Sequence, residues 1–226
     1  MTGAHRRRMD KFDREAVFFT DNAGDFPGGS SGATITGAIA GNMTMILAHD
    51  ADLTQTFDDK HQAQNIKGDA RDTLLEKESE IVMGAAAIGD AAVPGITSQF
   101  RMPEPRTEQN IIAKATAMHD EAAPPLEDMF ISVDLAHAFR DDLINARDAF
   151  QTARDNADSA AGQHAEAVGA LDELFRSTMD LSRQRSAVVK LKYRDNPGKL
   201  AAWLVASHLE KAPKPKPKDP PTPPTP

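Results

Sequence analysis

The sequence predicts an all-α protein: an elongated antiparallel helical bundle of the four-helix type, with extra short helices, an N-terminal arm and a proline-rich C-terminal tail. Apolar residues recur at spacings of three and four through most of residues 33–209, which is the helical period. No segment shows the strict apolar–polar alternation of a half-buried strand. Only 5% of the residues are aromatic, so the core must be built mainly from aliphatic and alanine side chains.

Three regions follow from the composition. Residues 1–32 form an N-terminal arm and a Gly-rich loop, residues 33–210 form the helical bundle, and residues 211–226 form an extended tail. The tail contains most of the chain's proline, which lacks a backbone donor and fixes φ, so it favours a polyproline-type conformation.

Turn and capping residues divide the first half of the bundle. Gly68 suits the left-handed position after a helix, and Asp69 can cap the next one, so we expect a break there. Val93-Pro94-Gly95 ends this second segment. Thr107 can cap a third helix, which Pro124-Pro125 breaks before opening the next.

The longest apolar seam covers residues 126–194 and fits either one helix or a hairpin that turns within residues 156–162. We favour the turn, because it gives segments that match the length of residues 33–66 and pack best. Asn196 then caps a short helix that Trp203 anchors. The residues predicted to pack the core or an interface are Phe139, Leu143, Phe150, Leu171, Phe175 and Trp203.

Composition also excludes several classes of function. The chain has no cysteine, which rules out disulfides, thiolate nucleophiles and cysteine metal sites. Its formal net charge is −8, which disfavours a broad nucleic-acid surface, and no nucleic acid is expected as a partner. Polar residues interrupt the charge-free stretch of residues 27–48, so we expect no membrane span. No secretory signal is seen, and we expect a cytoplasmic location.

Short motifs give little support for catalysis. Residues 28–32 match the G-x-S-x-G pattern of serine hydrolases, but no strand precedes them, so a Gly/Ser linker is the better interpretation. The acidic segment 21–25 lacks the closing glutamate of a calcium loop. The basic cluster of residues 5–8 has no interleaved aromatic residues and is interpreted as a solvated, disordered start of the chain.

A carboxylate metal site in a bundle needs inward-facing Glu and His residues one helical turn apart. The sequence contains two Asp-x-x-His pairs, Asp58/His61 and Asp134/His137. The first lies in a polar run, whereas the second is expected on a helix beside an apolar stripe. Asp134 and His137 are therefore the leading ligands, although we predict no catalytic residue, no bound metal and no cofactor.

The combined pattern predicts a non-enzymatic structural or protein-interaction bundle that associates with itself, a homo-oligomer that could serve as the subunit of an assembly or filament. Apolar surface beyond what one core covers would be buried against another copy. One alternative is a metal- or small-ligand-binding bundle that uses Asp and His side chains. Another is an adaptor whose proline-rich tail, or N-terminal arm, docks a protein partner.

Overall fold

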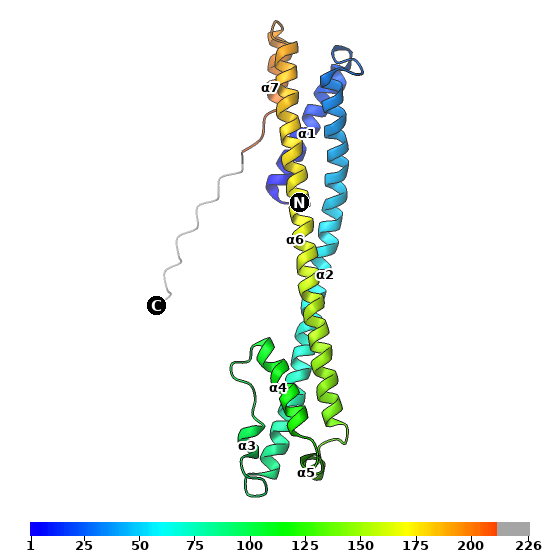
Figure 1. Cartoon of the computed structure of the whole chain (residues 1–226). Coiled ribbons are helices and arrows are strands. Elements are labelled where there is room, and N and C mark those ends of the chain that lie inside the picture. The colour runs from blue at the N-terminus through cyan, green and yellow to red at the C-terminus, as the bar shows by residue number, and fades with distance from the viewer. Residues whose placement is uncertain (212–226) are drawn as a thin grey trace, which may run out of the picture. The chain divides into compact units, whose positions relative to one another are not determined.

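The computed structural model describes residues 1–211, so the predicted tail lies, apart from Lys211, outside the described residues. Within this range the chain is helical and contains no strand, which confirms the all-α prediction (Figure 1). The helices are α1 (Gly3–Asp21), α2 (Ser31–Ile88), α3 (Ile96–Gln99), α4 (Glu108–Glu121), α5 (Leu126–Ser132), α6 (Phe139–Lys192) and α7 (Pro197–Ala206), with a 3-10 turn at Ala23–Asp25.

The chain forms two compact units. Unit 1 contains Met1–Leu53 and the described residues from Ala167 onward, and unit 2 contains Thr54–Glu166. The division falls inside both α2 and α6, so each unit contains one segment of each long helix.

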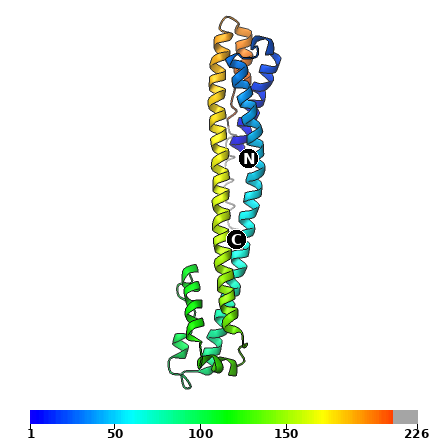
Figure 2. The ribbon, with the colours of Figure 1, turned by 45° about the vertical axis from the view of Figure 1, so that its right-hand side comes forward.

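Unit 1 packs α1 and α7 with its segments of α2 and α6 (Figure 2). Its core has two parts. The first contains Met9, Phe12, Ile39, Ile46, Leu171 and Phe175. The second contains Phe18, Phe19, Phe26, Val189, Tyr193 and Trp203. Most of the aromatic side chains of α1 are therefore buried, because they face helices that are distant in sequence.

Unit 2 packs the three short helices α3, α4 and α5 with the other segments of α2 and α6. Its core is continuous and mainly aliphatic. The largest fully buried side chains are Leu74, Ile81, Ile96, Phe100, Phe130 and Phe150.

Two predicted helix starts are confirmed by their capping geometry. The Thr107 hydroxyl accepts a hydrogen bond from the backbone N–H of Asn110 at 3.3 Å, and α4 begins at the next residue. The Asn196 side chain accepts from the N–H of Lys199 at 3.1 Å, where α7 begins with a proline. In both cases a short polar side chain satisfies an amide that has no partner within the helix.

Two predicted breaks are wrong. Helix α2 continues through Gly68, and α6 continues through residues 156–162. One glycine costs a helix only about 1 kcal/mol, and burial of flanking residues such as Leu74 outweighs that cost. Ala153 and Ala157 are likewise buried, so α6 keeps a packed face across the expected turn.

The chain turns instead at residues 133–138, between α5 and α6. Asp134 adopts a φ of 70°, the left-handed region that Asp tolerates better than most residues. The start of the chain also differs from expectation, because the basic cluster of residues 5–8 lies within helix α1 and is not disordered.

Candidate functional site

The six residues predicted to pack are all buried. Phe139, Leu143 and Phe150 lie in the core of unit 2. Leu171, Phe175 and Trp203 lie in the two core clusters of unit 1. The Trp203 indole also donates a hydrogen bond to the Ser186 hydroxyl at 3.1 Å, which satisfies its single buried N–H.

The leading metal ligands do not lie where the sequence placed them. Asp134 and His137 are exposed on the turn before α6 and are not on one face of a helix. Asp58 and His61 are exposed on α2, where the His61 ring contacts Phe57 with a centroid distance of 4.3 Å. Among residues 1–211 no three His, Asp or Glu side chains gather in a way that could hold a metal ion.

Ser30, the serine of the G-x-S-x-G pattern, caps helix α2. Its hydroxyl accepts from the backbone N–H of Ala33 at 3.2 Å. A serine hydrolase would need this serine on a strand-to-helix turn, and residues 1–211 contain no strand. The motif is thus explained by local helix geometry.

A buried ionic cluster in unit 1 joins α1 to α6, and the sequence did not reveal it. Lys11 donates to Glu15 at 2.5 Å and also to Ser182, whose hydroxyl donates to Glu15 at 2.9 Å. Arg185 donates to the second oxygen of Glu15, and both side chains are fully buried. The only sequence signal was the i,i+4 spacing of Lys11 and Glu15, which is common on exposed helix faces.

Burial lowers the pKa of Arg185, and the neighbouring Glu15 carboxylate partly reverses that effect. The guanidinium also lies 5.2 Å from the ring centroid of Phe19 and 5.9 Å from that of Trp203. These contacts hold a cation in an apolar environment. The cluster joins helix α1 to helix α6 through fully buried side chains, which positions the two helices within unit 1.

Glu78 is the second ionisable group that the sequence did not single out. Its side chain is fully buried in unit 2, and neither carboxylate oxygen has a hydrogen-bond partner among residues 1–211. Burial raises its pKa to about 7, against smaller opposing effects of Lys114 and Arg106.

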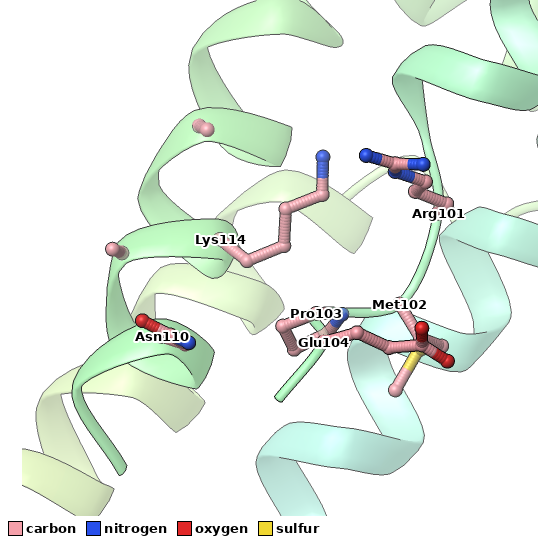
Figure 3. A pocket seen from close by; sticks show the side chains of 8 residues that line it. Arg101, Met102, Pro103, Glu104, Asn110 and Lys114 are labelled. Atoms are coloured by element: carbon pink, nitrogen blue, oxygen red, sulfur yellow. The ribbon is translucent and has the colours of Figure 1, made fainter. Parts of the chain in front are cut away.

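A cavity in unit 2 lies between the segment after α3 and helix α4 (Figure 3). It has a volume of about 810 Å³. Arg101 and Lys114 line it together with the apolar side chains of Met102 and Pro103.

A different kind of surface occurs on α2 in unit 1. We call it the neutral face, and it consists of the exposed residues Thr34, Gly37, Ala38, Ala40, Gly41, Thr44, Met45, Leu47 and Ala48. No Asp, Glu, Lys or Arg occurs between residues 27 and 48. Met45 and Leu47 are 45% and 58% exposed, and a Cβ atom added at Gly37 or Gly41 would meet no atom within 4 Å.

Comparison of the chain with protein-family models, curated proteins and solved structures gave no match. In the part of the chain that the structure describes, no helix is both long and apolar enough to cross a bilayer.

Proposed function

We propose that this chain is a non-enzymatic structural or interaction protein that associates with a second copy through the neutral face of α2. The observation on which the proposal rests is an exposed helix face that contains no charged residue, in a chain of which 27% of residues are charged. The proposal extends to a subunit of a larger assembly or filament.

The composition of this face supports an interface. The water-facing side of a surface helix normally carries charged and polar residues. The neutral face instead carries small residues together with the exposed Met45 and Leu47. A partner that covers these two side chains would remove apolar surface from water, which is favourable. Similar exposure of Phe57, Ile66 and Met83 on α2 of unit 2 adds further apolar surface.

A second copy of the chain is the occupant that charge favours. Two molecules of net charge −8 repel each other wherever acidic surfaces meet. In a two-fold symmetric contact one patch faces itself, so a patch without charges brings no like charges together. Gly37 and Gly41 lack side chains and have open space above them, which lets a partner helix approach closely.

Sedimentation velocity or light scattering over a range of protein concentrations tests the proposal. We expect the wild-type mass to rise with concentration and the variant Met45→Glu to remain a monomer, because it places a carboxylate in the symmetric contact. Gln184→Glu is the matched control, since it adds the same charge at an exposed position of α6 in unit 1.

A wild-type chain that stays monomeric at every concentration would contradict self-association. If wild type associates and Met45→Glu associates equally well, the neutral face is not the interface. Circular dichroism of both variants checks that the helices are retained.

A further inference from the structure

We propose that the cavity beside α4 binds a small molecule that carries a phosphate group, with Arg101 and Lys114 as the residues that hold the phosphate. The cavity lies within unit 2, and eight residues line it: Arg101, Met102, Pro103, Glu104, Asn110, Ala113, Lys114 and Ala117. The inference is independent of self-association.

Neither Arg101 nor Lys114 forms an ion pair within the described residues, although Lys114 lies near enough to Glu78 to oppose the rise in the pKa of that carboxyl group. Several other arginines of unit 2 pair with acids, as Arg140 does with Glu127 at 2.7 Å and Arg147 with Asp148 at 2.6 Å. Lys114 donates one hydrogen bond, to the carbonyl oxygen of Gln99 at 2.7 Å, and its ammonium group has three donors. Arg101 is exposed, and its guanidinium has five donors for an incoming acceptor.

The directions of the side chains indicate where an anion would bind. The ends of Lys114 and Arg101 point toward each other across the cavity (Figure 3). Two facing cations repel each other, and a bound anion would convert this repulsion into attraction. Glu104 is the one acid among the lining residues, and its carboxylate lies toward Met102 and away from both cations (Figure 3).

A phosphate group matches this pair better than a carboxylate does. The planar guanidinium of Arg101 can donate two parallel hydrogen bonds to phosphate oxygens, and the Lys114 ammonium acts as a compact second charge. Two positive charges balance a phosphate dianion, whereas a carboxylate supplies only one negative charge.

Apolar side chains provide room for the rest of the ligand. Met102, Pro103, Ala113 and Ala117 line the cavity, and its volume of about 810 Å³ lies in the range of small-molecule sites. The phosphate is therefore expected to carry an apolar substituent of modest size.

The site is also held together before any ligand binds. Helix α4 is anchored in the core through Ile111 and Ala115. From α4, Lys114 holds the carbonyl of Gln99, and the Asn110 amide donates to the carbonyl of Pro105 at 2.9 Å. These bonds fix both ends of the segment that supplies Arg101, which reduces the entropic cost of binding.

Titration calorimetry on the full chain at constant ionic strength, with inorganic phosphate, phenyl phosphate and benzoate, tests the inference. We expect phenyl phosphate to bind most tightly, because it combines the dianion with an apolar ring. Arg101→Gln and Lys114→Gln should each weaken its binding by about tenfold or more, as expected for loss of one charge-assisted contact. Lys60→Gln is the control, because it removes a cation of unit 2 that does not line the cavity.

Three results would overturn the inference: no saturable binding of either phosphate, equal binding of benzoate, or equal weakening by Lys60→Gln. Arg101 is exposed and donates no hydrogen bond within residues 1–211, so Arg101→Gln leaves the fold intact even if Lys114→Gln disturbs it. Unchanged melting temperatures without ligand verify this. Binding of phenyl phosphate does not depend on the oligomeric state. A negative result in this experiment therefore leaves the self-association proposal unaffected, and the reverse also holds.

Discussion

Glu78 shows how one residue can link the packing of unit 2 to pH. Its carboxyl group is fully buried and has no hydrogen-bond partner in the described part of the chain, so the charged form is disfavoured and the pKa is raised to about 7. An acid with a pKa above its unfolded value binds more protons in the folded state. Its contribution to stability is therefore fully present below the unfolded pKa of about 4.5 and is lost as the pH rises through about 7.

We predict that Glu78→Gln removes this pH dependence. The contribution of Glu78, taken as the wild-type minus the Glu78→Gln free energy of unfolding, should fall by up to roughly 3 kcal/mol between about pH 4.5 and pH 7, at 1.36 kcal/mol per pKa unit. The glutamine variant should lose less and be the more stable protein above pH 7. Urea unfolding across this pH range measures the effect, and parallel pH profiles for the two proteins would refute it.

The sequence could not reveal Glu78. It lies in a run with Lys77 and Glu80, which pair with each other at 3.0 Å and are only partly exposed, and such charged runs are usually solvated. The apolar pattern of α2 does not show which residue of this run is covered, because the burial of Glu78 depends on segments distant in sequence, such as α4 with Lys114. Arg185 could not be identified from the sequence either, because it is buried against Glu15, which is distant in sequence.

At the scale of elements, the long helices override local break signals. Gly68 lies inside α2, and a Cβ atom added there would meet nothing within 4 Å. Gly84, on the same helix, is different: an added Cβ would approach Leu135 at 2.7 Å and Phe130 at 2.9 Å. Gly68 is therefore merely tolerated in the helix, whereas Gly84 permits close packing of Phe130 and Leu135.

These two glycines make a matched pair of predictions. Gly68→Ala should raise the free energy of unfolding by about 0.5–1 kcal/mol, through better helix propensity alone. Gly84→Ala should lower the free energy of unfolding, because overpacking typically costs about 1–3 kcal/mol, which exceeds the gain in helix propensity. Thermal unfolding followed by circular dichroism compares them. If Gly68→Ala is destabilising, the helix does not continue through that position.

Element boundaries could be predicted where local chemistry decides them. Thr107 and Asn196 act as caps through contacts three residues away, which are visible in sequence. The turn at Asp134 could not be placed, because it depends on how Phe130 and Leu135 pack over Gly84. For the same reason the sequence pattern placed Asp134 and His137 on a helix, whereas the structure places them on the turn before α6.

At the scale of the whole molecule, the two units have separate cores. The core of unit 2 is built only from residues of Thr54–Glu166. The two core clusters of unit 1 are built only from residues outside that range. The chain contains one tryptophan, Trp203, which is fully buried in unit 1. Its fluorescence therefore reports on unit 1 alone.

We predict that Ile111→Ala weakens unit 2 without an equal effect on unit 1. Ile111 is fully buried, and such a truncation costs about 2–5 kcal/mol. The midpoint from circular dichroism should fall more than the midpoint from Trp203 fluorescence in urea unfolding. Identical shifts by both probes would instead indicate one cooperative transition.

By itself, the sequence determined that the chain is helical, where several helices begin, and that cysteine chemistry is absent. These properties follow from periodicity, caps and composition, which act over a few residues. Only the tertiary structure decided the rest: that α2 and α6 are unbroken, that Glu78 and Arg185 are buried, and that Arg101 and Lys114 face one cavity. Each of these depends on contacts between segments far apart in the chain, whose burial energy exceeds local preferences of about 1 kcal/mol.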